Sequence, residues 1–259
     1  MYKIVVFFTL FLFSFGTAQG ATLFWDGFGG SSGSVNTDKW HFESHSFAQT
    51  QFVPYVWKDG NYAHLSLNRN GFKGTSMRTK NWFSPGNGQI VAEARVNIAH
   101  NQRGIVHGFF FYDEFSFSGG QAQRSHELDF EWLTNKTTSS NNDQMLYSTW
   151  NNWYRPTPRY NQEYNNGHHM GAFKASGVQT NNQWHTYKMV WKCGSVEFFI
   201  DNNYQHGFYG DAVPCGAQQL FLNSWVPSSD WSDAYYSGLN QSNNNDYKTM
   251  LVNWVRVTD

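Results

Sequence analysis

The stretch SHELDFEW, residues 125 to 132, places three acids at every second position, Glu127, Asp129 and Glu131. Apolar residues fill the gaps, and this alternation predicts a β-strand whose carboxylates share one face. Three like charges in a row repel, so the pKa of at least one is expected to rise. A protonated acid beside an ionised carboxylate is what glycosidic bond cleavage needs: one protonates the leaving oxygen, and the other attacks the anomeric carbon or activates water.

The spacing of the acids limits this interpretation. Retaining glycosidases hold their two carboxyl groups about 5–5.5 Å apart. On a strand, the Cα atoms of neighbouring acids are about 6.6 Å apart and those of the outer pair about 13 Å apart. Glu127 and Glu131 can therefore meet across one sugar only if the strand curves and their side chains lean inward. Spacing alone does not choose the pair, and a solvated strand face is the alternative.

The rest of the chain favours an all-β fold. Alternating apolar residues predict further strands, and turn pairs such as Asp59-Gly60 and Pro85-Gly86 separate them. The clearest strands are expected at residues 89 to 98, 185 to 192, 195 to 201 and 250 to 257. Residues 151 to 183 and 226 to 248 are rich in Asn, Gly, Ser and Tyr and are expected to form loops. Many short strands with turns between them indicate a sandwich of two antiparallel sheets.

The composition points to a neutral ligand. Aromatic residues make up 19% of the chain and charged residues only 14%, with a formal net charge of −1. This balance does not suit a phosphate backbone, so nucleic acid is excluded as a partner. Forty-nine rings are too many for a core alone. Surface rings with few charges suit a sugar, which offers C–H faces for stacking and hydroxyls for hydrogen bonds.

The N-terminus and two cysteines indicate export. Residues 1 to 20 contain an uncharged apolar run followed by Ala18-Gln19-Gly20, which predicts a signal peptide rather than an anchor. Residues 21 to 259 would form one secreted domain with no membrane segment after cleavage. In that setting Cys193 and Cys215 form either a disulfide or two free buried thiols. Asn135 and Asn240 each begin an N-glycosylation pattern.

The motif ELDFE resembles the E-x-D-x-E signature of glycoside hydrolase family sixteen. Further segments in the same order resemble this family, and together they span roughly residues 55 to 257. They are SMRTKNWFSPGNGQIVAEARV, GIVHGFFFYDE, WHTYKMVWKCGSVEFFIDN, LNSWVPSSDW and NWVRV. The resemblance implies a β-jelly roll with its cleft on a concave sheet. It implies Glu127 as nucleophile, Glu131 as general acid/base and Asp129 as the hydrogen-bonding partner that helps set their pKa values.

The resemblance also implies a set of substrate-binding side chains. An arginine would contact substrate hydroxyls, two aromatic residues would line the cleft, and an N-x-W pair would bind sugar near the cleaved bond. These are Arg78, Phe110, Tyr112, Asn223 and Trp225. Trp231 and the tyrosines of NNWYRPTPRY are candidate stacking platforms. The pair His168 and His169 has no acid cluster beside it and is interpreted as solvated rather than metal-binding.

Three departures from the family pattern are visible. Ser125 stands where lichenases usually carry a tryptophan. Asn253 stands where the family's structural calcium often uses an aspartate, so calcium is possible but unsupported, and no cofactor is required. No extra residue separates Asp129 from Glu131, which argues against the subgroup with a bulge, which includes laminarinases and many agarases.

The sequence therefore predicts a monomeric, retaining endo-β-glucanase that acts on β-1,3-1,4-glucan. The alternatives are a xyloglucan-type endotransglycosylase, a laminarinase-like β-1,3-glucanase and a non-catalytic jelly-roll carbohydrate-binding protein.

Overall fold

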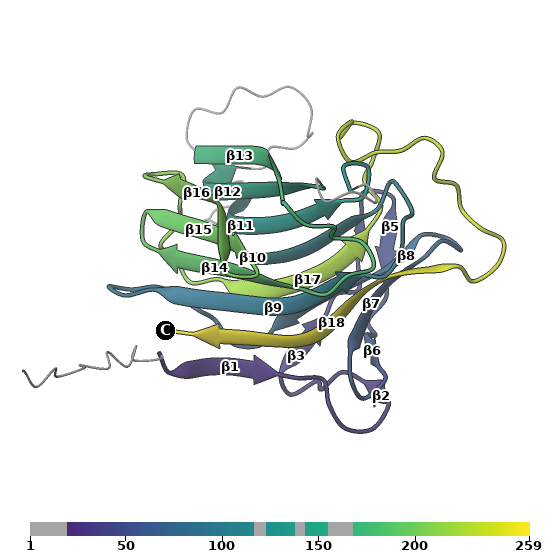
Figure 1. Ribbon diagram of the computed structural model, residues 1–259, viewed down its shortest axis with the longest axis horizontal. Coiled ribbons are helices and arrows are strands. Elements are labelled where there is room, and N and C mark those ends of the chain that lie inside the picture. Colours follow the sequence, from purple (N-terminus) through teal and green to yellow (C-terminus); the bar gives the residue numbers. More distant parts are fainter. Residues whose placement is uncertain (1–19, 117–122, 138–142, 155–167) are drawn as a thin grey trace, which may run out of the picture.

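The computed structural model describes residues 20–116, 123–137, 143–154 and 168–259. These residues form a two-layered β-sandwich, in agreement with the predicted all-β fold (Figure 1). No helix in these ranges is long and apolar enough to cross a membrane. The signal peptide predicted at residues 1 to 20 lies, except for Gly20, outside the described part of the chain.

One layer carries a cleft on its outward face and is called the cleft sheet. Its neighbouring strands are antiparallel throughout. In spatial order they are β13 (His168–Ala175), β12 (Gln144–Tyr154), β11 (Gln123–Leu133), β10 (Val106–Ser116), β17 (Gln219–Trp225), β8 (Lys73–Thr79) and β3 (Trp40–Phe42).

The other layer is called the outer sheet. Its main strands, in spatial order, are β16 (Asn203–Tyr209), β15 (Ser195–Ile200), β14 (His185–Lys192), β9 (Ile90–Ile98) and β18 (Tyr247–Thr258). The long strand β18 pairs with β1 (Thr22–Asp26) at one end and β7 (Ala63–Asn68) at the other. The short strands β6 (Trp57–Lys58) and β2 (Gly33–Ser34) continue the sheet beyond β7. A hairpin of β4 (Ser46–Phe47) and β5 (Thr50–Phe52) joins β8 through a parallel pairing.

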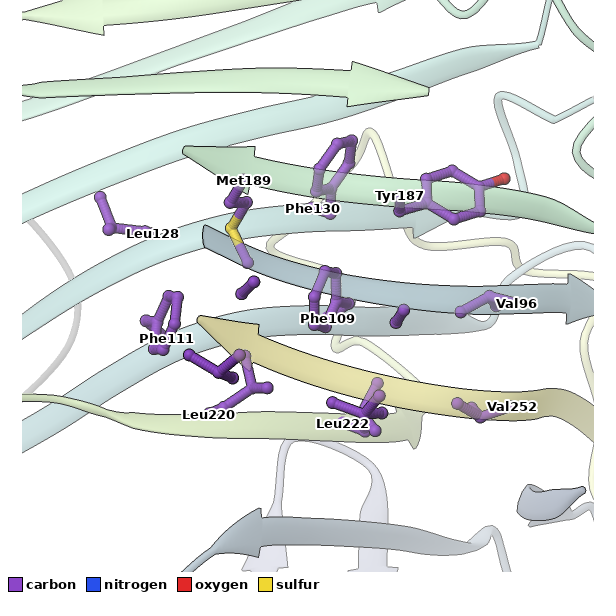
Figure 2. Packing of buried hydrophobic residues seen from close by; sticks show 14 of the residues in the cluster. Val96, Phe109, Phe111, Leu128, Phe130, Tyr187, Met189, Leu220, Leu222 and Val252 are labelled. Atoms are coloured by element: carbon purple, nitrogen blue, oxygen red, sulfur yellow. The ribbon is translucent and has the colours of Figure 1, made fainter. Parts of the chain in front are cut away.

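The core lies between the two sheets. Figure 2 shows Phe109, Leu128, Phe130 and Leu222 of the cleft sheet packed against Met189 of β14 and its neighbours, with the strands bowed around them. Because side chains on a strand alternate in direction, filling this layer with the apolar half of each strand turns the polar half outward. Burial of this apolar surface is the dominant stabilising term.

The predicted loops were half right. Residues 226 to 246 form no strand, as expected, but the interval from 151 to 183 is not all loop. β12 continues to Tyr154, and β13 occupies His168–Ala175. The Asn and Gly residues of this interval have low strand propensity, which is why it was expected to be a loop. Its strand segments are stabilised by cross-strand pairing rather than by intrinsic strand propensity.

The two cysteines form a disulfide. Cys193 follows β14, and Cys215 precedes β17, so the bridge ties a turn of the outer sheet to the segment that enters the cleft sheet. Of the two states left open by the sequence, the structure contains the disulfide.

Candidate active site

The predicted acid strand is β11. It keeps continuous register with β10 from Gln123 to Leu133, so the segment that carries the acids contains no bulge against that neighbour. Leu128, Phe130 and Trp132 are fully buried in the core. The three carboxylates consequently project from the opposite face, where all of them line the same cleft.

Neutral residues flank the three acids in register. On β10 and β12 their partners are Tyr112 and Trp150 for Glu127, Phe110 and Ser148 for Asp129, and Gly108 and Leu146 for Glu131. None of these six carries a positive charge that would offset the carboxylates. The register with β12 shifts between Ser125 and Glu127, a local irregularity of the kind often found beside functional sites.

Burial and mutual repulsion raise the pKa of two of the acids. The pKa of Glu131 rises to about 8, first because its charged form loses hydration and second because the charge of Glu127 lies close by. The pKa of Asp129 is also well above its ordinary value, through burial and the charges of Glu127 and Glu131. Glu131 is therefore protonated at neutral pH, as a general acid must be.

Asp129 connects the acids to a short hydrogen-bond chain. The indole Nε1 of Trp150 donates to Ser148 Oγ over 3.3 Å, and Ser148 Oγ in turn donates to Asp129 Oδ2. Asp129 is also hydrogen-bonded to Glu127, a contact that favours the protonated form of Asp129. A protonated Asp129 donates to Glu127 and so supports the carboxylate form of Glu127. Ser148 was not predicted from the sequence, although the alternation of Leu146, Ser148 and Trp150 was a usable signal.

Aromatic rings form one wall of the cleft. Phe110 stacks on Phe221 with ring centroids 5.1 Å apart, and Tyr112 meets Phe221 edge-on at 5.7 Å. Phe110 and Tyr112 were both predicted to line the cleft, and the structure places them there. Phe110 is 9% exposed, so it serves the packing of the wall as well as its surface.

Arg78 lines the cleft and is held there by two contacts. Its Nη1 lies 3.4 Å from Glu43 Oε1, and its guanidinium lies 5.8 Å from the centre of the Phe221 ring. Its Nε is buried and makes no hydrogen bond to any described residue. The sequence did not single out Glu43, because nothing local marks an acid 35 positions away as the partner of Arg78.

Asn223 and Trp225 of β17 also reach the cleft. Asn223 Oδ1 is buried and has no hydrogen-bond partner among the described residues. A Cβ added at Gly108 would lie 2.7 Å from this oxygen, so only glycine leaves the space beside Asn223 and Glu131 open. Trp225 stacks on Trp231 with centroids 5.7 Å apart, which places Trp231 behind the cleft wall.

Other residues complete the cleft. They come from the β3–β5 region and from β8, which the sequence did not connect with the acids. These additional lining residues are His45, Phe47, Phe52 and Ser76. Of the two tyrosines predicted as stacking platforms, Tyr160 lies outside the described residues, whereas Tyr154 ends β12.

The remaining predicted positions are not among the residues that line the cleft. The ring of His169 stacks on Trp150 at 3.5 Å, and the side chain of His168 lies outside the described set. In the described ranges, no cluster of three or more His, Cys, Asp or Glu could hold a metal ion. Asn253 donates its amide hydrogen to the Asn61 carbonyl over 3.2 Å.

Both glycosylation patterns lie in described residues. Asn240 is exposed. Asn135, by contrast, is half-buried and uses its amide nitrogen to donate to the carbonyls of Ala234 and Tyr235, at 2.9 and 2.5 Å.

Together, these features define a β-jelly-roll protein whose cleft is lined by Glu127, Asp129 and Glu131. The family model for "Glycosyl hydrolases family 16" matches residues 44–256. The chain belongs to this family, which confirms the resemblance seen in the sequence. No curated protein matches the sequence.

Solved structures share the fold at low identity. The β-glucanase of Bacillus licheniformis superposes with a TM-score of 0.67 at 19% identity, over 91% of this chain and 97% of that one. An endo-1,3-β-glucanase from Streptomyces sioyaensis gives a TM-score of 0.68 at 16% identity, over 93% and 96%. LamA E269S of Zobellia galactanivorans, solved with laminaritriose and laminaritetraose, gives 0.66 at 13% identity, over 93% and 100%.

Proposed function

We propose that this protein is a secreted, retaining endo-β-glucanase that hydrolyses β-1,3-1,4-glucan. One observation carries the proposal: Glu127, Asp129 and Glu131 line a single cleft in which Glu131 holds a proton at neutral pH while no cation flanks the acids in register. Membership of family 16 supports glycosidic bond cleavage as the chemistry.

The first chemical step would form a glycosyl-enzyme intermediate. A carboxylate oxygen of Glu127 attacks the anomeric carbon, and the bond from that carbon to the leaving oxygen breaks. Glu131 gives its proton to the leaving oxygen as the bond breaks. Asp129 donates its hydrogen bond to Glu127 in the ground state, and this bond weakens as the negative charge of Glu127 is lost in forming the new bond to the anomeric carbon.

The second step would return the enzyme to its starting state. Glu131, now a carboxylate, takes a proton from a water molecule whose oxygen attacks the anomeric carbon. The bond to Glu127 breaks, and the sugar leaves with the configuration it had in the substrate.

Two features support a neutral glucan as the substrate. Aromatic rings line the cleft: Tyr112 is half-buried and has a face open for stacking, whereas Phe221 and Trp225 are each 7% exposed and form the apolar wall. Two of its buried polar atoms, Arg78 Nε and Asn223 Oδ1, have no partner among the described residues. Buried polar atoms without partners are costly, and sugar hydroxyls can satisfy both a donor and an acceptor. The pairing of β11 shows no bulge between Asp129 and Glu131, which favours the mixed-linkage glucan over laminarin.

A product analysis tests the proposal. The purified protein is incubated with β-1,3-1,4-glucan, laminarin, xyloglucan and agarose, with and without added acceptor oligosaccharides. We expect short oligosaccharides with retained anomeric configuration from the mixed-linkage glucan alone. Longer products on addition of acceptor would show a transglycosylase instead. Binding of glucan with no new reducing ends would show a non-catalytic binding protein.

A further inference from the structure

We infer that a pocket on the outer sheet is a second, non-catalytic binding site for neutral β-glucan chains. It lies on the outward face of β7, between β6 and the first residues of β8 and β18, strands that neighbour one another in Figure 1. We call it the outer pocket and define it by Tyr55, Trp57, Ser66, Asn68, Tyr247 and Thr249.

Exposed rings gather around this pocket. Tyr55, Trp57 and Tyr247 are 47%, 40% and 58% exposed. In the described part of the chain, nine large hydrophobic side chains are exposed, and these three surround one hollow. Single exposed hydrophobic residues are ordinary, but rings grouped around a concavity mark a binding surface.

The floor of the outer pocket is polar and uncharged. The hydroxyls of Ser66 and Thr249 are 2.9 Å apart, and Asn68 Nδ2 donates to Asn245 Oδ1 over 2.9 Å. A hydroxyl has one donor and two acceptor positions, so the Ser66–Thr249 contact leaves a donor and several acceptors for a ligand. Rings above a floor of hydroxyl and amide groups match the stacking faces and hydroxyls of a sugar.

The charges of the outer pocket differ from those of the cleft. Among its described lining residues there is no carboxylate, so it has no group that could attack or protonate a glycosidic bond. Lys73 is the one permanently charged residue among its described lining residues. His64 also lines the pocket, and its Nε2 is hydrogen-bonded to Asp59 Oδ2 at 3.0 Å. This composition suits binding of a neutral chain without chemistry.

The outer pocket and the cleft share β8 as a wall. Ser76 and Arg78 line the cleft, whereas Lys73 and Thr75 line the outer pocket. The outer pocket is therefore separate from the three acids, but it and the cleft lie on opposite faces of the same strand, β8. The choice of β-glucan as its ligand rests on the proposed function. A long polymer can occupy both sites, whereas a short oligosaccharide in the cleft does not need the second.

The test compares two double variants. Trp57→Ala/Tyr247→Ala removes two rings of the outer pocket. Trp82→Ala/Tyr204→Ala removes one Trp and one Tyr of similar exposure, 54% and 55%, that line neither site. Binding to soluble β-1,3-1,4-glucan, laminarin and xyloglucan is measured by titration calorimetry with Glu127→Gln added to prevent hydrolysis. Turnover of a short aryl oligosaccharide is measured with Glu127 intact.

We expect the outer-pocket variant to bind polymer about tenfold more weakly while turning over the short substrate within twofold of the unsubstituted chain. The control variant should change neither value. Tyr247→Ala alone, at the most exposed of the rings, guards against misfolding and should weaken polymer binding about threefold.

Three results would overturn the inference. The first two are equal polymer affinity of the two double variants and no polymer binding by any variant. The third is binding that 0.5 M salt abolishes, since salt at roughly this concentration screens charge pairs and the loss would indicate an anionic ligand. Failure of the proposed function is read separately, as absence of turnover of the short substrate by the unsubstituted chain.

Discussion

Strands β9 and β11 have the same pattern of inward and outward residues, but the acids on them have opposite kinds of neighbours. Each is a central strand with one apolar face in the core and one polar face outward. On β9, Glu93 faces Lys188 of β14 and Arg256 of β18 in register, and Arg256 Nε donates to its carboxylate over 2.9 Å. On β11, the neighbours of Glu131 are Gly108 and Leu146.

The difference shows that a strand's neighbours, rather than its own pattern, decide whether an outward acid supports the fold or chemistry. Cross-strand pairs of opposite charge are stabilising, whereas adjacent like charges oppose folding. The in-register neighbours of the three acids on the cleft sheet are neutral, whereas those of Glu93 on the outer sheet are cations. Family 16 membership and the raised pKa of Glu131 fit a site that gives up stability for reactivity.

The largest expected effect separates the two acids by activity. Glu127→Ala removes the proposed nucleophile and should lower kcat on glucan by at least about 10⁴-fold, as loss of a covalent nucleophile does elsewhere. Added azide should restore cleavage and give a product of inverted configuration. Glu93→Ala is the matched control and should leave kcat within a few-fold. Full activity of Glu127→Ala without azide would assign the nucleophile elsewhere.

A second substitution tests the support of the acids by β12. Ser148→Ala removes the hydroxyl that donates to Asp129 and should lower kcat/KM roughly 10- to 100-fold, the range expected when a buried polar group loses its hydrogen-bond partner. Ser224→Ala, on β17 and outside the cleft lining, is the control for loss of a buried serine. A purely structural role for Ser148 would lower the melting temperature and leave the pH profile of kcat/KM in place, whereas the proposed role shifts that profile.

The pH dependence of activity tests the raised pKa directly. In the proposed mechanism Glu131 carries a proton in the first step, so kcat/KM should fall above pH 8, by about tenfold per pH unit once the acid is ionised. Initial rates on β-1,3-1,4-glucan, whose sugar leaving group is a poor one, from pH 5 to 10 would show this limb. Loss of the Glu131 proton should slow cleavage of a substrate with a poor leaving group more than that of a substrate with an activated leaving group. A profile flat to pH 10 would contradict the role of Glu131.

The smallest expected effect is on stability and has opposite signs on the two strands. The folded-state pKa of Glu131 lies above its unfolded value of about 4.5, so the folded state binds more protons between that pH and 8, and stability falls across this window. Glu131→Gln should therefore raise the free energy of unfolding at pH 8, by on the order of 2 kcal/mol. Glu93→Gln leaves Arg256 without its ion pair and should lower it by roughly 1 kcal/mol. Urea unfolding of both variants at pH 8 would measure the difference, and a loss in both would remove the contrast.

Much of this arrangement could be predicted from the sequence because apolar and polar residues alternate along a β-strand, and the apolar positions identify the face that points into the core. The strand expected at residues 185 to 192 coincides with β14, and that expected at 89 to 98 differs from β9 by one residue. The face on which Glu127, Asp129 and Glu131 lie followed from the same rule. The end of β12 and all of β13 were not predicted because cross-strand pairing outweighs the weak strand propensity of residues such as Asn151 and Gly171.

The walls of the cleft could not be read in the same way. Arg78 and Asn223 were reached only through family resemblance, whereas Glu43 and Ser148 were missed. Each of these depends on which distant strands become neighbours, and local periodicity carries no information about that. The outer pocket was missed for the same reason, since its rings come from segments almost 200 positions apart.

The bonded amide of Asn135 has a practical consequence for making this protein. A glycan on that nitrogen would displace one of the hydrogens that anchor the backbone of Ala234 and Tyr235. That backbone belongs to the segment bearing Trp231, which braces Trp225 at the cleft. Production in a host that attaches sugars to the nascent chain would thus install the modification before these hydrogen bonds form, so bacterial material, which keeps the Asn135 amide, is the reference for every rate measured.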